Sequence, residues 1–578
     1  MNLRGGDRRV DPFLQRLSAL RSIRLWFSLW VALPVLHGCT HSHTIADRTL
    51  REVEIVVGQG QRTTLTANER AGLQAWLNEN RTGWDRYRVT LPAPEVMIRS
   101  EQFVLSLNVT SLFLTQSEPP SLVRELDKSD FEFFRSLGSD PKTLLACETS
   151  KTTSSLMTSA CADMRIAQLH KGTAVTPPLS GIQISLMDAG RPAESIALGF
   201  AQLENDDSIS LRTDHKVRIA SVSKLVVAIG VMRLVESGQL DLDADVSDYL
   251  GWPLRNPAFP DSPITARQLL AHTSSVRDGS RYFIKAGQGG LRDFFDPESV
   301  LWEGGSHFAS EVGRGPGQFF LYSNLGFGLL GTVIERVSGM RFDRFMAREV
   351  LEPLRLTASF SACDVAATQR AAAFRKRPVN TNEWEPEGPW VAQVDGGEPQ
   401  CFYGMSDLDD PSAFLENYEL GTNASLFSPQ GGLRASADDL VRVLAMFAAG
   451  GELDGVRVLQ EATVAEMLEP QWTFDSNNGQ SAGEAEPNGP TEGLMTSYGL
   501  SVHRIDMRAW GFNDGPEFLV GHLGEAYGVL SLALFDPESG DGIASIITGT
   551  ADDPAKAPGH SPLYRIEEEV LRWWVSRR

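Results

Sequence analysis

The chain has 578 residues, 42% hydrophobic and 22% charged, a composition typical of globular protein rather than of a disordered or membrane-embedded chain. Because this length exceeds one compact core, we expect two or more domains. The formal net charge of −21 argues against a nucleic-acid partner, since a phosphate backbone needs clustered Lys and Arg. It also disfavours general capture of anionic substrates, although a local pocket can differ from the average.

Residues 1–39 have the pattern of a signal peptide. Several arginines precede an apolar run from Leu25 to Leu36, which is shorter than the roughly 20 apolar residues of a membrane-spanning helix. The run ends in Leu36-His37-Gly38-Cys39, which resembles a bacterial lipobox. We therefore expect an exported protein, either periplasmic or held at the membrane as a lipoprotein through Cys39. Plain cleavage and an uncleaved anchor stay open as alternatives.

Residues 40–175 predict a small N-terminal α+β region of unknown role. Glu52 to Val57 alternates apolar and polar residues, and Phe103 to Leu114 is rich in strand formers. A capping box at Thr66 predicts a helix that runs from there to about Asn80. A second helix is expected over Ser121 to Leu137.

The five cysteines of an exported protein are candidates for disulfides. Without Cys39, four remain, and proximity in sequence favours Cys147–Cys161 and Cys363–Cys401 among three connectivities. The sequence contains no Cys-x-x-Cys or His-Glu-x-x-His motif, so it predicts no metal site.

Residues 176–578 predict strands at both ends and helices between them. Early strands are expected at Gly181 to Asp188 and Ile196 to Phe200, and a helix over Leu225 to Gln239. The late candidates are four strands and a closing helix: Tyr498 to Ile505, Phe518 to His522, Val529 to Asp536, Ile543 to Thr548, and Arg565 to Ser576. This order predicts an α+β fold with one antiparallel sheet built from both chain ends around a helical lobe.

Two polar segments of this region, residues 366–427 and 476–496, are expected to be long surface insertions. Both insertions are expected to border the substrate-binding pocket.

The first chemical motif is Ser221-Val222-Ser223-Lys224, at the predicted start of a helix. Residues three apart share one helix face, so Lys224 can accept the proton of the Ser221 hydroxyl if the lysine is desolvated. Alone the motif is weak, because an N-cap serine is the commoner role. Ser139-Asp140-Pro141-Lys142 has the same spacing, but no apolar helix follows it.

Two later motifs complete the pattern. In Tyr322-Ser323-Asn324 the phenol can shuttle a proton to the leaving group, and Asn324 can fix Lys224 and bind a substrate amide. In His522-Leu523-Gly524 the glycine allows close approach of a substrate backbone, and His522 is expected to hydrogen-bond near Tyr322. Taken singly, these motifs are also compatible with a turn and a surface histidine.

The three motifs together resemble the signature elements of the serine β-lactamase-related superfamily, which includes class C β-lactamases and penicillin-binding proteins. The Gln268 to Ser275 segment (QLLAHTSS) and the Gly431 to Leu440 segment also resemble that superfamily. The likeness begins near Pro178 and implies a β-lactamase/transpeptidase-like fold.

The resemblance implies acyl transfer through a covalent acyl-Ser221, with no cofactor. Lys224, Tyr322, Asn324 and His522 are the other expected catalytic residues. The backbone N–H groups of Ser221 and Glu525, next to Gly524, would form the oxyanion hole.

One departure bears on the substrate. Relatives that act on penicillins carry Lys-Thr-Gly or Lys-Ser-Gly where this chain has His522-Leu523-Gly524, and the Glu525 carboxylate is expected to repel an anion. Ser275 also stands where the superfamily usually has glycine.

We therefore expect a serine hydrolase acting on small esters or D-amino-acid amides and peptides, with weak or no β-lactam turnover. Two alternatives remain: a β-lactamase or D,D-carboxypeptidase acting on peptidoglycan-like peptides, and a non-catalytic sensor or wall-binding lipoprotein.

Overall fold

The computed structural model divides the chain into two compact units, residues 1–151 and 152–578. It describes seven strands between residues 54 and 125, and residues 165–578 except 174–175, 205–206, 377–387, 482–492 and 551–560. The signal peptide, the Cys147–Cys161 pair and the helix expected over residues 66–80 lie outside the described residues.

The described strands of the first unit form one antiparallel sheet in the order β2-β1-β4-β5-β6-β7-β3. Their bounds are β1 Glu54–Val57, β2 Gln61–Thr64, β3 Asp85–Tyr87, β4 Val96–Arg99, β5 Phe103–Asn108, β6 Ser111–Gln116 and β7 Ser121–Glu125. The strands expected at 52–57 and 103–114 are confirmed. The helix expected over 121–137 is wrong at its start, because β7 pairs with β6 and β3 on its two edges and this pairing overrides the local pattern.

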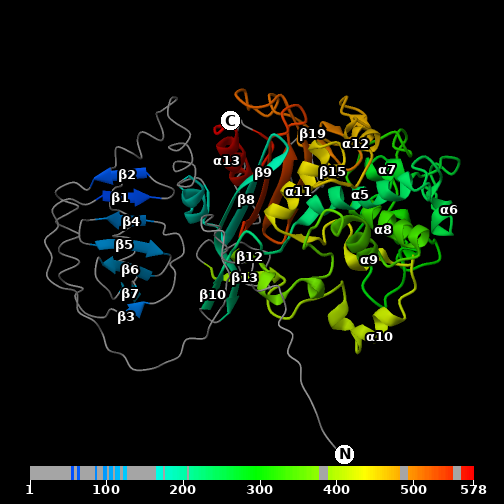
Figure 1. Ribbon diagram of the computed structural model, residues 1–578. Coiled ribbons are helices and arrows are strands. Elements are labelled where there is room, and N and C mark those ends of the chain that lie inside the picture. Colours follow the sequence, from blue (N-terminus) through cyan, green and yellow to red (C-terminus); the bar gives the residue numbers. More distant parts are fainter. Residues whose placement is uncertain are drawn as a thin grey trace, which may run out of the picture. The chain divides into compact units, whose positions relative to one another are not determined.

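The second unit is built on a nine-stranded antiparallel sheet in the order β10-β9-β8-β22-β21-β20-β19-β18-β17 (Figure 1). The strands are β8 Gly181–Asp188, β9 Arg191–Glu204, β10 Asp207–Ser210, β17 Trp472–Thr473, β18 Ser497–Tyr498, β19 His503–Asp506, β20 Phe518–Ala526, β21 Val529–Phe535 and β22 Gly542–Thr548. Early strand β8 pairs with late strand β22, so both ends of the unit meet in the centre of the sheet. The expected α+β fold is confirmed.

Helices fill the chain between the early and late strands. They are α5 Ser223–Glu236, α6 Val246–Leu250, α7 Ala266–Leu270, α8 Asn324–Ser338, α9 Phe342–Met346, α10 Pro411–Glu416, α11 Ala437–Ala448 and α12 Glu461–Leu468, with α13 Arg565–Val575 closing the chain. Short strand pairs join β11 Val217–Arg218 to β14 Arg434–Ala435, β12 Ala373–Lys376 to β13 Trp390–Val394, and β15 Glu452–Leu453 to β16 Val456–Arg457.

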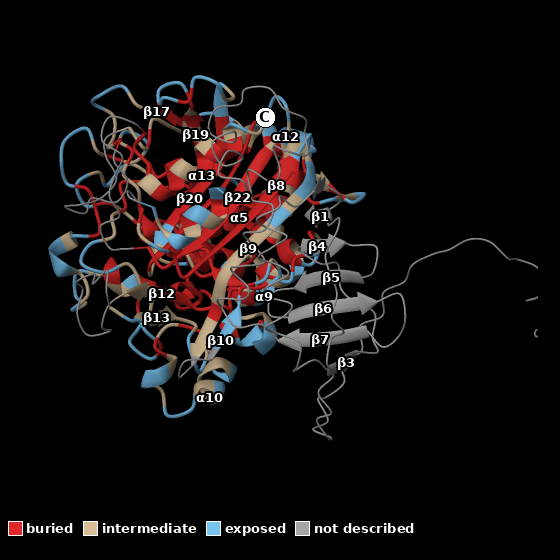
Figure 2. Ribbon diagram, turned by 90° about the vertical axis from the view of Figure 1, so that its left-hand side faces the viewer, coloured by how far each residue is buried: buried red, intermediate tan, exposed pale blue. Residues whose placement is uncertain are grey.

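Alternation along the central strands gives the sheet two apolar faces, and its centre is buried (Figure 2). In β21, Val529, Ala533 and Phe535 pack with α5, α8 and α11. The intervening Leu530 and Leu532 pack with α13 on the opposite face. A side chain's position along a strand therefore decides which of the two faces it reaches.

The boundary between the units lies earlier than the expected residue 175. Residues 165–171 form a helix, and its Ile166 and Leu169 are buried in the same apolar cluster as Trp573 and Trp574 of α13. This helix belongs to the second unit because its apolar side chains complete that cluster.

The strand expected from Tyr498 to Ile505 is two strands, β18 and β19, because residues 499–502 form a tight turn in which Ser501 has φ 60°. Residues 366–427 are more than a surface insertion. They carry two strands and a helix, and Phe402 and Phe427 are buried in the main core.

The expected Cys363–Cys401 disulfide is confirmed. Within the described residues, no helix has the length and apolar character needed to cross a bilayer.

Candidate active site

The candidate nucleophile lies on a sharp turn between strand β11 and helix α5. Ala220 directly before it adopts φ 47°, a left-handed conformation that costs a non-glycine residue free energy. The turn is tied down because the Ser223 hydroxyl donates to the Ala220 carbonyl at 2.7 Å and accepts from the Leu433 N–H at 3.1 Å. Ser221 is left half-buried at the start of the helix.

Lys224 brings the predicted residues together. It is fully buried in α5, one turn after Ser221. Its Nζ donates to Ser221 Oγ at 2.9 Å, to Asn324 Oδ1 at 2.8 Å and to the Gln430 carbonyl at 2.8 Å. An amine that donates to three acceptors is protonated, so Lys224 can act as a base only after it loses one of these protons, and burial favours the neutral amine.

Tyr322 places its ring beside the same amine. Lys224 Nζ lies 4.8 Å from the centroid of the Tyr322 ring. The His272 ring lies 4.3 Å from the Tyr322 ring, centroid to centroid. Tyr322 is half-buried, so part of the residue is exposed to solvent.

Asp278 holds the Tyr322-Ser323-Asn324 segment and was not found from the sequence. Its carboxylate accepts hydrogen bonds from the Ser323 hydroxyl at 2.9 Å, Asn324 Nδ2 at 3.0 Å and the Leu325 N–H at 2.9 Å. The bond to Nδ2 orients Asn324 so that its Oδ1 faces Lys224. Asp278 follows the Gln268 to Ser275 segment by three residues, and this spacing is the one signal that could have pointed to it.

The expected role of His522 near Tyr322 is wrong. The imidazole is fully buried, and its Nε2 accepts from the Tyr498 hydroxyl at 2.9 Å. Its Nδ1 donates to the Leu523 carbonyl at 2.6 Å. Both ring nitrogens of His522 are therefore occupied by hydrogen bonds in the interior, which makes it a positioning residue.

His522 is one of three buried histidines, with His272 and His503, that we call the imidazole cluster. Burial, followed by the positive charge of Lys224, lowers the pKa of His503 to about 3. Burial, reinforced by neighbouring positive charges, lowers the pKa of His272 and of His522 well below the usual value. The cluster is neutral at neutral pH, so His522 supplies no fixed cation.

Gly524 allows the close approach of the nucleophile's own backbone, and the expected approach of a substrate backbone stays a prediction. A Cβ at this position would lie 2.9 Å from Ser221 N, 2.9 Å from the Ile219 carbonyl and 2.6 Å from Ser531 Oγ. The Ser531 hydroxyl also donates to the Ile219 carbonyl at 2.7 Å. Glycine is required here because the nucleophile's own backbone packs directly on β20.

The expected repulsion by Glu525 is also wrong. Glu525 follows Gly524 in β20, so its side chain leaves from the opposite face of the sheet. The Tyr564 hydroxyl, just before α13, donates to the Glu525 carboxylate at 2.7 Å. Only the backbone of Glu525 faces the site.

No metal centre competes with this arrangement in the part of the chain that the structure describes, where no three or more His, Cys, Asp or Glu are grouped to hold an ion. A buried lysine hydrogen-bonded to a serine hydroxyl, with a tyrosine ring beside the amine, is the arrangement expected of an active-site serine hydrolase. The chain belongs to the beta-lactamase family, whose family model, described as "Beta-lactamase", matches residues 173–563, more than half of the sequence.

Two curated relatives share parts of this region. Esterase EstB of Burkholderia gladioli is 31% identical over 288 residues, which cover 46% of this chain and 66% of the esterase. Penicillin-binding protein 4* of Bacillus subtilis is 30% identical over 158 residues, 27% of this chain and 32% of that protein. The chain thus spans somewhat less than two thirds of the first relative and about a third of the second.

The chain is also similar to solved structures. The D-amino acid amidase of Ochrobactrum anthropi, complexed with D-phenylalanine, is 19% identical with a TM-score of 0.44, covering 69% of this chain and 94% of the amidase.

Proposed function

We propose that the protein is an exported esterase that cleaves small esters through an acyl-Ser221 intermediate, with D-amino-acid amides and peptides as further substrates. The hydrogen bond of 2.9 Å between Lys224 Nζ and Ser221 Oγ carries the proposal. The similarity to esterase EstB supports the ester class.

In the proposed reaction Lys224, with Tyr322, takes the proton of Ser221 as Oγ attacks the ester carbonyl carbon. The backbone N–H groups of Ser221 and Glu525 stabilise the developing oxyanion. The C–O bond to the leaving alcohol breaks, and Tyr322 returns a proton to that oxygen. A water molecule then attacks the acyl carbon and releases the acid from Ser221.

The site differs from one suited to β-lactams. The position of the fixed lysine is taken by His522, which is buried and neutral, and the hydroxyl position is taken by Leu523. These two changes favour esters over β-lactams and over peptides with a terminal carboxylate.

Export rests on two observations. The first is the basic and apolar pattern of residues 1–39, with Cys39 as the candidate lipid-bearing residue. The second is the Cys363–Cys401 disulfide, since such bonds persist in oxidising compartments.

The test compares purified wild type with Ser221→Ala on 4-nitrophenyl butyrate, nitrocefin and a D-Ala-D-Ala peptide. We expect the ester to be cleaved with the highest kcat/KM and all ester turnover to be lost in the variant. Nitrocefin turnover comparable to that of the ester would contradict the substrate class. Absence of turnover on every substrate would favour a non-catalytic sensor.

A further inference from the structure

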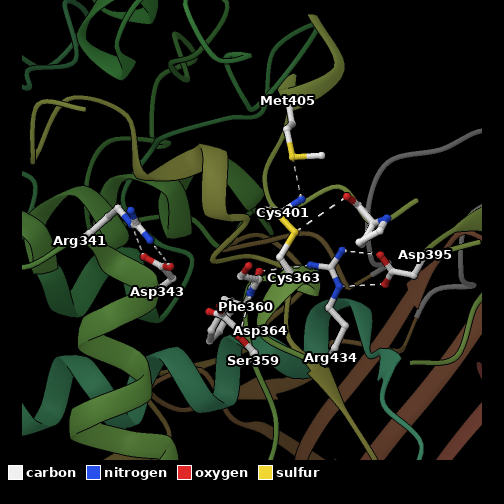
Figure 3. Close-up of a disulfide and its surroundings, with 12 residues drawn as sticks. Arg341, Asp343, Ser359, Phe360, Cys363, Asp364, Asp395, Cys401, Met405 and Arg434 are labelled. Atoms are coloured by element: carbon white, nitrogen blue, oxygen red, sulfur yellow. Dashed lines mark hydrogen bonds and ion pairs between the residues drawn. A yellow bond between two sulfur atoms is a disulfide. The ribbon is translucent and has the colours of Figure 1, made fainter. Parts of the chain in front are cut away.

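A cavity of about 280 Å³ opens beside the segment that leads into the nucleophile. Its wall combines the β11 strand, the 390–403 segment, the 426–434 segment and the turn after β20. The polar and charged side chains that matter for its chemistry are Arg218, Asp395, Glu398, Tyr403, Arg434 and Tyr527. The Cys363–Cys401 disulfide fixes one wall, because Cys401 lines the cavity (Figure 3).

Arg218 is part of this wall, and two of its three guanidinium nitrogens donate hydrogen bonds to protein groups. The residue is only 6% exposed. Its Nε donates to the Gly431 carbonyl at 3.0 Å, and its Nη2 donates to Tyr403 Oη at 2.7 Å and to Ser428 Oγ at 2.9 Å. Nη1 has no hydrogen-bond partner among the described residues. A guanidinium held in this way is a preorganised donor for an anion.

The carboxylate nearest to Arg218 is already bound by a second arginine. Both oxygens of Asp395 accept from Arg434, from Nε and Nη2 at 2.9 Å each (Figure 3). Arg434 Nη1 donates to the Phe360 and Gly432 carbonyls. Two buried guanidinium groups, Arg218 and Arg434, therefore lie near one buried carboxylate. Asp395 balances the charge of Arg434, and the positive charge of Arg218 is left without a paired carboxylate among the described residues. Glu398 is the opposing charge, and it is exposed at the rim.

Two tyrosines that line the cavity, Tyr403 and Tyr527, lie beside the Arg218 guanidinium. The Arg218 guanidinium lies 4.8 Å from the centroid of the Tyr527 ring and 5.3 Å from that of Tyr403. Burial raises the pKa of Tyr403, but the Arg218 charge and the hydrogen bonds of Tyr527, Ser428 and Arg218 together lower that pKa below its ordinary value. The two hydroxyls are 3.1 Å apart. The hydrogen bond between the two hydroxyls can run in either direction, and the Tyr527 hydrogen is left for a ligand when Tyr403, which accepts from Arg218, donates to Tyr527.

The cavity lies on the acyl side of the proposed reaction. Arg218 is three residues before Ser221, so their Cα atoms are at most about 11 Å apart. Lys224 lies between two segments, since it donates to Asn324 beside Tyr322 and to Gln430 beside the Arg218 contacts. In the proposed reaction the leaving group takes its proton from the Tyr322 side, so an acyl part that leaves Ser221 on the opposite side would run past Gln430 toward the cavity.

We propose that this cavity binds a carboxylate carried by the acyl part of the substrate, which accepts hydrogen bonds from Arg218 Nη1 and the Tyr527 hydroxyl. The inference rests on the proposed function and narrows its substrate class to half-esters or half-amides of dicarboxylic acids. The net charge of −21 does not prevent this, because the local field at the cavity is set by Arg218.

The test compares 4-nitrophenyl hydrogen glutarate with 4-nitrophenyl valerate, which has a methyl group in place of the distal carboxylate. We expect the wild type to favour the glutarate by about 10- to 100-fold in kcat/KM, the range of a charge-assisted hydrogen-bond pair. Arg218→Gln and the milder Tyr527→Phe should each lower that ratio. Arg212→Gln is the matched control, because it removes the same charge from an exposed neighbour outside the cavity and should leave the ratio unchanged.

A wild-type ratio of one or less, or a ratio unchanged in both Arg218→Gln and Tyr527→Phe, would overturn the inference while ester turnover still upheld the proposed function. If the enzyme cleaved neither ester, calorimetric titration with glutarate would decide. Binding that is lost in Arg218→Gln but kept in Arg212→Gln supports the cavity as a carboxylate site. No binding of glutarate to the wild type rejects it.

Discussion

The neutral state of His503 gives a pH dependence that can be isolated by one substitution. His503 is 2% exposed, and neither ring nitrogen has a hydrogen-bond partner among the described residues. Its pKa is about 3 in the folded protein and 6.5 without the fold. Unfolding therefore takes up a proton below pH 6.5, so the stability that the neutral ring provides is complete above pH 6.5 and is lost as the pH falls toward 3.

The magnitude follows from the span of pH. One pKa unit corresponds to about 1.4 kcal/mol, so lowering the pH from 7.5 to 5.0 costs about 2 kcal/mol of unfolding free energy through His503 alone. In His503→Leu this cost disappears, together with two unsatisfied buried polar atoms. Urea unfolding, followed by tryptophan fluorescence, gives the free energy of unfolding of the variant and of the wild type. The difference between them, variant minus wild type, should be about 2 kcal/mol larger at pH 5.0 than at pH 7.5.

Ser501→Ala is the matched control. Ser501 is buried in the turn that leads into His503 and does not titrate in this range, so its effect on stability should be equal at both pH values. A His503→Leu difference that is also equal at both pH values would refute the reasoning, because it would mean that the ring is not held neutral by burial.

Three other predictions concern the site and its frame. Lys224→Ala should lower kcat for ester hydrolysis by at least about 10³-fold with the fold retained by circular dichroism, and a loss below tenfold would contradict its role as base. Gly524→Ala should lower kcat by more than tenfold, because a Cβ would lie 2.9 Å from Ser221 N, whereas Gly326→Ala, with 3.6 Å to its nearest neighbour, should not; equal effects would count against the close approach. Loss of the Cys363–Cys401 disulfide, which spans 38 residues, should cost about 4 kcal/mol in urea unfolding, and an unchanged midpoint would argue against it.

The catalytic core could be predicted from the sequence because its spacing is local. Ser221 and Lys224 are one helical turn apart, and the turn alone brings the amine to the hydroxyl. The sheet built from both chain ends could also be predicted, because strand candidates at Gly181 to Asp188 and Ile543 to Thr548 lie before and after the helical middle of the region.

The contacts that could not be predicted join distant segments. Asp278 reaches Asn324, 46 residues later in the chain, through a hydrogen bond that no motif marks. The Tyr498 hydroxyl reaches His522 Nε2 because the turn at residues 499–502 folds β18 back along β19, which pairs with β20. Strand alternation was the usable signal for Glu525, since a residue next to a site-facing glycine points to the opposite face.

Acylation of Ser221 is the central claim, and intact-protein mass spectrometry tests it most directly. After incubation with a fluorophosphonate, wild type and Ser139→Ala should each gain the mass of one phosphonyl group, mapped by peptide digestion to Ser221. Ser221→Ala should gain none. Modification that persists in Ser221→Ala, or that maps to Ser139, would contradict the assignment of the nucleophile.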